Sequence, residues 1–246
     1  MNKHIKKSET LFSRRQVMIG AAGLTFAIAL PDGLKAAVLS GARTGTAISP
    51  WISIATDGTI TIMSAATEMG QGSMTSLPLV VAEELDADWA RVRIVPAPPL
   101  ENIYGNPGFG GAMMYTAGSN AVQSYYTPLR IAGAQVRRVL LDNAARKLGV
   151  LVEDLTTEPS TVVHAKSGRK LSYGDIAQFA EVPAKAPEIK PDQLKKTSDF
   201  RLIGKDVMRI ELPDKVNGRA QYAIDVQLPG MLYGAVLRAP VEDAAP

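Results

Sequence analysis

The sequence predicts an α+β fold, with mixed sheets and packed helices, from three local patterns. Residues 51–63 alternate between apolar and polar on both sides of Asp57-Gly58, which is the strongest hairpin signal in the chain. After a glycine turn, apolar residues recur at helical spacing from Leu77 to Leu85. A longer helical pattern then runs to Leu148 and is closed by Gly149.

The other elements are predicted from shorter patterns. A glycine-rich loop at residues 104–111 is expected to be ordered but irregular, and Pro128 to mark a kink or a second helix start. A short helix is expected at Tyr173–Ala180, followed by a proline-containing linker or surface crossing at residues 181–199. Strands are expected at Arg91–Val95, Leu155–Thr157, Thr161–Ala165, Arg209–Leu212 and Leu232–Leu237.

Composition excludes several kinds of chemistry. The 246-residue chain has no Cys, which excludes disulfides, thiolate metal sites, cysteine-ligated iron–sulfur clusters and Cys nucleophiles. Its two histidines, His4 and His164, do not favour a multi-histidine metal site, and His164 is interpreted as a surface or turn residue. No Ser-His-Asp set is indicated. The sequence therefore assigns neither a catalytic residue nor a protein ligand to a metal.

The net charge of +3 is located at the start of the chain. Residues 1–36 contain six of the 27 basic and two of the 24 acidic residues, so 21 basic and 22 acidic residues remain in the rest. A basic stripe for nucleic acid is therefore not predicted.

Residues 1–42 are interpreted as an export signal and a short linker. The apolar stretch Val17–Leu30 rises about 21 Å as a helix, less than the roughly 30 Å of a bilayer core, so a transmembrane span is not predicted. Arg14-Arg15 within Ser13–Met18 resembles the twin-arginine signature. A Sec signal or an uncleaved amphipathic anchor is the alternative. The twin-arginine route carries folded proteins, usually cofactor enzymes, so a periplasmic cofactor protein is the first hypothesis.

Glu68-Met-Gly-Gln-Gly72 lies between a predicted strand and a predicted helix. Its glycines would let backbone N–H groups approach an anion at the positive end of the helix, and the amide of Gln71 can donate and accept. Glu68 would be an awkward neighbour of a bound anion unless it points away. The alternative is that the glycines only satisfy a tight connection.

Thr116-Ala-Gly118-Ser119-Asn120 forms a similar corner ahead of the longer helix. Hydroxyl and amide side chains flank a flexible glycine, which suits an anion. The alternative role for Ser119 or Asn120 is that of a helix N-cap, and both roles can coexist.

Taken in order, the motifs resemble the molybdenum-cofactor subunit of the xanthine dehydrogenase/aldehyde oxidase family. The matching segments are Glu68–Gly72, Thr116–Ser119, Pro128–Arg137, Lys215–Asp225, Leu228–Tyr233 and Arg238–Pro240. The Lys-Val-x-Gly-x-Ala-x-Tyr hammerhead motif follows the Glu-Met-Gly-Gln-Gly motif here. This order points to the isoquinoline 1-oxidoreductase β-subunit type and the related membrane-associated aldehyde dehydrogenases.

The resemblance implies a cofactor and partners. It places a molybdenum–molybdopterin cytosine dinucleotide against Gly70, Gln71, Gly72, Thr116, Gly118, Ser119 and Asn120. The metal in this family is held by the pterin dithiolene, so the absence of Cys is compatible with it. Electrons would leave through a separate [2Fe–2S] subunit, with a cytochrome c as a further candidate partner. Association with the membrane would then occur through partners.

The resemblance also implies a domain plan. The expected parts are the signal and linker at 1–42, part of a molybdopterin-binding α+β domain at 43–180, a linker at 181–200 and the start of an incomplete α/β hammerhead domain at 201–246. Family members are about three times as long and carry their catalytic glutamate near the C-terminus. We therefore expect an N-terminal fragment of an enzyme that hydroxylates aldehydes or N-heterocycles, inactive as it stands. The rival interpretations are a cofactor-free periplasmic binding or scaffold module and a non-functional truncated remnant.

Overall fold

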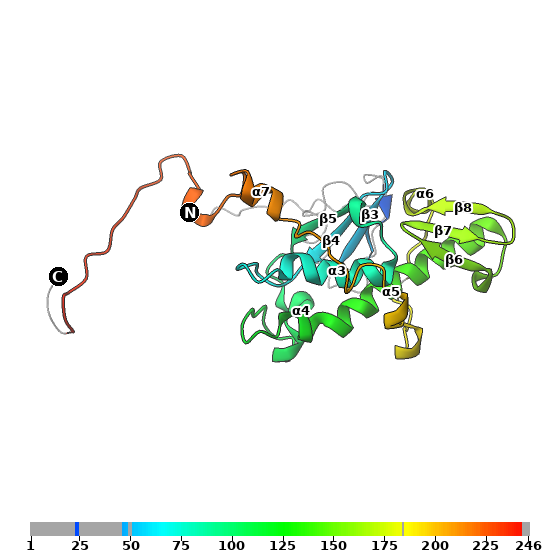
Figure 1. Ribbon diagram of the computed structural model, residues 1–246, viewed down its shortest axis with the longest axis horizontal. Helices are drawn as coiled ribbons and strands as arrows, with labels where there is room; N and C mark the ends of the chain where they lie inside the picture. Colours follow the sequence, from blue (N-terminus) through cyan, green and yellow to red (C-terminus); the bar gives the residue numbers. More distant parts are fainter. Residues whose placement is uncertain (1–22, 25–45, 49–50, 184, 243–246) are drawn as a thin grey trace, which may run out of the picture. The chain divides into compact units, whose positions relative to one another are not determined.

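The computed structural model describes residues 23–24, 46–48, 51–183 and 185–242 (Figure 1). Apart from Gly23 and Leu24, the predicted export signal lies outside these residues. The chain divides into two compact units, the first ending at Arg209 and the second beginning at Ile210. Helices and small mixed sheets make the first unit an α+β structure, as predicted.

The first sheet is built on the predicted hairpin. Strands β3 (Ile52–Ala55) and β4 (Ile60–Ser64) pair antiparallel, with Ile52 opposite Ile62 and Ile54 opposite Ile60. Strand β5 (Val92–Pro96), also predicted, pairs parallel with β4. The short strands β1 (Gly23–Leu24) and β2 (Thr46–Ile48) both pair with β3. The parallel pairing of β4 and β5 requires a crossover, and a helix supplies it.

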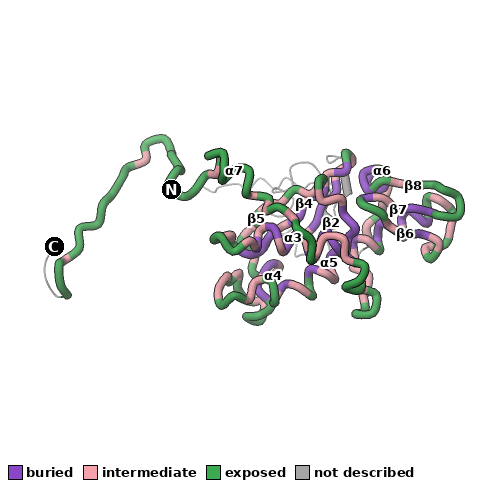
Figure 2. Tube along the Cα trace, viewed as in Figure 1, coloured by how far each residue is buried: buried purple, intermediate pink, exposed green. Residues whose placement is uncertain are grey.

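Helix α3 (Ser73–Leu85) covers this sheet, and α5 (Ala121–Leu148) packs on α3 (Figure 1). Helix α3 is the crossover from β4 to β5. Of the two alternatives predicted at Pro128, a kink or a second helix start, the second helix start is wrong, because α5 continues through this residue. Proline costs one backbone hydrogen bond, and the buried face of α5 compensates for that loss. Figure 2 shows the buried residues along these elements, which include Ile54, Ile62, Leu77, Val81, Leu85, Leu129, Val136 and Leu140.

The helices approach most closely at Gly133. A Cβ atom added to Gly133 would lie 2.5 Å from the Val81 carbonyl oxygen and 2.9 Å from Glu84 Cβ. Such a contact is possible only without a side chain on α5 at this point, so Gly133 sets the distance between the two helices.

The glycine-rich loop before α5 is ordered, as predicted. It follows the short helix α4 (Glu101–Tyr104) and contains a 3₁₀ turn at Pro107–Phe109. The buried side chain of Asn106 organises it, donating to the Tyr115 carbonyl at 2.8 Å and accepting from the Gly108 N–H at 2.9 Å. Tyr125 on α5 donates its hydroxyl to the Tyr104 carbonyl at 2.6 Å, which fastens α4 to α5.

A second, antiparallel sheet follows α5. It consists of β6 (Leu155–Glu158), β7 (Thr161–His164) and β8 (Arg169–Ser172), and α6 (Tyr173–Ala177) follows. The first two strands and the helix were predicted, whereas β8 was not. Of the two alternatives for His164, the surface position is wrong: the residue is 6% exposed, and its Nδ1 lies 2.6 Å from Ser167 Oγ. The turn is present, because the Ser167 N–H donates to the His164 carbonyl at 3.2 Å.

Three buried acidic residues lie at the C-terminal end of α3. We call this set, Glu83, Glu84 and Asp86, the acidic cluster. Residues 195–203, here named the strap, lie against it. Glu83 Oε2 accepts the backbone N–H groups of Arg201, Leu202 and Ile203 at 2.9, 2.6 and 3.1 Å. Its other oxygen pairs with Lys195 Nζ at 3.0 Å. The strap is therefore bound to the end of α3 by its backbone as well as its side chains.

Basic side chains of α5 complete the neutralisation of the acidic cluster. Arg130 pairs with Glu84 at 2.6 Å, and Arg137 pairs with Asp86 at 3.5 Å. Asp86 also pairs with Lys195 and with Arg201, the latter at 3.1 Å. Burial opposes ionisation of Asp86, but its bonds from Lys195 and Thr157 outweigh this and lower its pKa.

The second unit contains one α-helix, α7 (Leu212–Val216), among its described residues. The strands predicted at Arg209–Leu212 and Leu232–Leu237 are wrong: the first segment is a turn leading into α7, and the second has no regular structure. A strand needs a partner, and no described residue of this unit pairs with them. Apolar side chains here stay exposed, Leu232 at 92% and Val236 at 84%. Within the described ranges, no helix has the length and apolarity needed to cross a bilayer.

Candidate functional site

The first corner, residues 67–74, leads from β4 into α3. Gly70 and Gly72 have φ values of 106° and 87°, in the left-handed region that favours glycine. A Cβ added at Gly70 would meet no atom within 4 Å. The glycines are therefore required for the path of the backbone, and the surface beside Gly70 is open.

The side chain of Glu68 turns into this corner and does not point away from it. Oε1 accepts the N–H groups of Gly70 at 2.8 Å and Gly72 at 3.0 Å, and Oε2 accepts that of Met74 at 3.0 Å. Glu68 therefore caps the start of α3, where no N-cap side chain does so. Burial raises its pKa, but the three N–H donors and Arg209 have the larger combined effect, so the pKa lies below its usual value.

The side chain of Gln71 folds back over the same corner. Nε2 donates to the Thr67 carbonyl and to Ser73 Oγ, both at 2.7 Å, and Oε1 accepts the Met69 N–H at 2.6 Å. Its amide thus supports the corner from within. The backbone N–H of Gln71 has no acceptor among the described residues and remains available to a ligand.

The second corner, residues 116–120, precedes α5. Gly118 and Ser119 both have left-handed backbones, with φ values of 64° and 55°. This conformation costs a serine about 1 kcal/mol. Asn120 occupies the N-cap position, but its Oδ1 accepts from Asn106 Nδ2 at 3.3 Å instead of from the helix. The hydroxyl of Ser119 is exposed and has no partner among the described residues.

The two corners meet. Thr67 N–H donates to Thr116 Oγ1 at 3.1 Å, and the hydroxyl of Thr116 keeps its own proton to donate. Further along, Gly133 of α5 lies against Val81 and Leu85 of α3, so both helices run in the same direction from the joined corners (Figure 1). Two helix N-termini, each carrying a partial positive charge, therefore lie side by side there.

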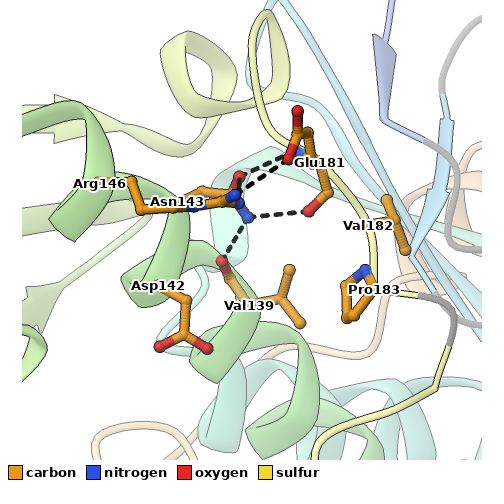
Figure 3. Close-up of a pocket in the computed structure, with 7 residues that line it drawn as sticks. All are labelled: Val139, Asp142, Asn143, Arg146, Glu181, Val182 and Pro183. Carbon is orange, nitrogen blue, oxygen red and sulfur yellow. Dashed lines mark hydrogen bonds and ion pairs between the residues drawn. The ribbon is translucent and has the colours of Figure 1, made fainter.

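A hollow of about 250 Å³ lies near the C-terminal end of α5, and its polar groups serve to hold the structure together (Figure 3). The side-chain amide of Asn143 makes hydrogen bonds here with both its nitrogen and its oxygen. It donates to the carbonyls of Val139 at 2.8 Å and Glu181 at 3.0 Å, and it accepts from Glu181 N–H at 2.8 Å and Arg146 at 2.7 Å. The charged residues of the hollow pair with one another or with a neighbour, Arg146 with Glu181 and Asp142 with Arg138, so the corners are the better candidate. Among the described residues, no three His, Asp or Glu side chains are placed to hold a metal ion.

The sequence analysis named Glu68 but missed its role as a cap, and it missed Arg209 altogether. The capping role of Glu68 is consistent with an acid just ahead of a helix start, a signal that was available. Arg209 could not be predicted from local sequence, because it lies 141 residues from Glu68 and 139 residues from Gly70 in the chain. In the structure, its Nη2 lies 3.0 Å from Glu68 Oε1 and its Nη1 lies 3.1 Å from the Gly70 carbonyl oxygen.

Comparison with known proteins identifies relatives of this chain. Residues 5–222 match the family model described as molybdopterin cofactor-binding domain. The β subunit of isoquinoline 1-oxidoreductase from Brevundimonas diminuta is 38% identical over 95% of this chain and 34% of its own length. A membrane-bound aldehyde dehydrogenase (pyrroloquinoline-quinone) from Gluconacetobacter polyoxogenes is 34% identical over 95% of this chain and 30% of its own. A nicotinate dehydrogenase subunit from Pseudomonas putida is 35% identical over 77% of this chain and 15% of its own. The chain thus spans about a third or less of the length of these relatives.

Proposed function

The chain belongs to the molybdopterin cofactor-binding domain family, and from this premise we propose that its joined corners hold part of the molybdenum cofactor. The observation that carries the proposal is the bond between Thr67 and Thr116, which brings together two predicted binding motifs 49 residues apart. When bound, the cofactor supplies the redox chemistry of molybdenum. The chain's own residues bind and orient it.

The donors at the corners fit an anionic ligand with many acceptors. The Gln71 N–H and the hydroxyls of Thr116 and Ser119 are available beside two helix N-termini. The N–H groups of Gly70 and Gly72, by contrast, already bond to Glu68. We therefore propose that the two glycines shape the corner, and that direct bonds come from Gln71, Thr116 and Ser119, with Gly118 and Asn120 placing Ser119.

Several finer features belong to the proposal. We propose that the cofactor is the cytosine dinucleotide form, that the substrates are aldehydes or N-heterocycles, and that a [2Fe–2S] subunit and a cytochrome c are partners. The relatives' names support the substrate class.

Export by the twin-arginine route to the periplasm is supported by Arg14-Arg15 and the apolar stretch after it. The domain plan of 43–180, 181–200 and 201–246 also remains a proposal.

Replacing Ser119 by glycine tests the site. We expect the unfolding free energy to change by less than about 1 kcal/mol, because relief of the left-handed strain offsets the flexibility of glycine. Pterin retained per chain should fall several-fold, because the free hydroxyl is lost. Pterin is measured by native mass spectrometry of the full chain, made in a host that synthesises the dinucleotide.

Ser160→Gly is the matched control. Ser160 also has a left-handed backbone, with φ of 51°, but its buried hydroxyl accepts the Asp88 N–H at 2.8 Å. This variant should lose about 1–2 kcal/mol of stability and keep its pterin. Equal pterin in wild type and Ser119→Gly would contradict the assignment of Ser119. A folded wild type without pterin would favour the cofactor-free binding module.

A further inference from the structure

We infer that Arg209 is the positioning residue of the first corner: it neutralises Glu68 and orients the Gln71 N–H toward a ligand. The inference rests on the proposed function, since the ligand is the cofactor held there. Arg209 belongs to the same compact unit as the corner. Its guanidinium contacts Glu68 Oε1 at 3.0 Å through one nitrogen and the Gly70 carbonyl at 3.1 Å through another.

The first role is electrostatic. The side chain of Glu68 is 13% exposed, and the N–H groups of Gly70, Gly72 and Met74 that bind it carry no net charge. Without a cation, its full negative charge would repel an anionic ligand at the same corner. Among the described residues, Arg209 is the basic residue that forms an ion pair with Glu68. The corner can therefore accept an anion although it contains a carboxylate.

The second role is orientation. The Gly70 carbonyl and the Gln71 N–H belong to one peptide unit, and in a trans peptide these two groups point in opposite directions. By bonding the Gly70 carbonyl, Arg209 fixes the direction of the Gln71 N–H, which has no acceptor among the described residues. The planar guanidinium holds its two nitrogens in a rigid fork that bonds both the carboxylate and the carbonyl, whereas a lysine ammonium would replace the charge without fixing the orientation.

The strap brings the chain to α3 shortly before Arg209. The backbone of residues 201–203 is bound to Glu83, and Arg209 follows six residues later. Arg209 thus connects a segment late in the chain to a loop that begins at Thr67.

Arg209→Met, Arg209→Lys, Glu68→Gln and the double variant Arg209→Met/Glu68→Gln test the inference in the full chain. We expect Arg209→Met to retain about tenfold less pterin, the size typical of losing a charge-assisted hydrogen bond. Arg209→Lys should recover part of the loss. The double variant should retain more pterin than Arg209→Met, because the repelling charge is gone. Arg138→Met, which removes an exposed pair with Asp142, is the control and should retain wild-type pterin.

Amide exchange of the pterin-free chain gives a second readout. Arg209→Met should speed the exchange of Gly70 and Gly72 amides by about tenfold, because Glu68 is held less firmly. Wild-type pterin content in Arg209→Met, or a double variant worse than Arg209→Met, would overturn the inference while the proposed function stands. A pterin-free wild type would overturn the proposed function and the ligand role together, and the exchange rates would still decide whether Arg209 positions Glu68.

Discussion

Glu83→Ala is expected to lower the free energy of unfolding by about 3–5 kcal/mol, the cost of breaking a buried ionic contact from one side. The carboxylate is fully buried and accepts three backbone N–H groups of the strap together with Lys195 Nζ. Its removal leaves these donors unsatisfied inside the protein. Denaturant unfolding of the purified chain measures the change.

Two further variants keep this prediction testable if Glu83→Ala does not fold. Glu83→Gln retains an acceptor and should lose less stability than alanine. Glu153→Ala removes an exposed acid on the same unit and should change stability by less than about 0.5 kcal/mol. A Glu83→Ala chain within about 1 kcal/mol of wild type would mean that the strap does not depend on this carboxylate.

The same carboxylate predicts the response to acid. Burial opposes the ionisation of Glu83, but the N–H groups of Leu202 and Ile203 and the bond from Lys195 keep its pKa below the usual value. A group with a lowered native pKa contributes stability above its unfolded pKa, about 4.3 for Glu, and loses that contribution as pH falls toward the native value. The difference between wild type and Glu83→Ala should therefore shrink below about pH 4.

Gly133→Leu should prevent the native packing of α3 on α5. Even the Cβ of Gly133→Ala would lie 2.5 Å from the Val81 carbonyl oxygen, so the helices must separate. Alanine gains about 1 kcal/mol of helix propensity but should still lose about 1–3 kcal/mol overall, because overpacking forces backbone shifts. Leucine adds further atoms to the same contact and should cost more.

Thermal unfolding of Gly133→Ala and Gly133→Leu measures how much stability each variant loses. Gln123→Ala is the control, because it changes an exposed position of α5 and should not lower stability. A Gly133→Leu chain as stable as wild type would show that the close helix contact is absent in solution.

Patterns confined to a few neighbouring residues were predictable. Asp57-Gly58 between alternating strands specifies the β3–β4 hairpin, and Gly149 ends α5 with φ of 66°. The strap was not predictable, because Glu83 binds N–H groups 118 to 120 residues away. Glutamates at the end of an amphipathic helix normally face solvent, and only tertiary contacts bury them.

The same limit applies to the candidate site. The motifs around Gly70 and Ser119 were identified from local sequence, but their junction through Thr67 and Thr116 is a long-range contact. The strand predicted at Leu232–Leu237 was wrong for a related reason. Alternation of apolar residues indicates a tendency to pair, and a strand forms only where a partner edge is present.

The pterin content of Thr116→Val, compared with wild type and Thr116→Ser, tests the joined corners most directly. Valine removes the oxygen that accepts the Thr67 N–H at 3.1 Å and the hydroxyl available to a ligand, whereas serine keeps both. We predict about one-tenth of the wild-type pterin per folded chain in Thr116→Val and near wild-type content in Thr116→Ser. Equal pterin in all three chains, or none in a cooperatively folded wild type, would contradict a cofactor site at these corners.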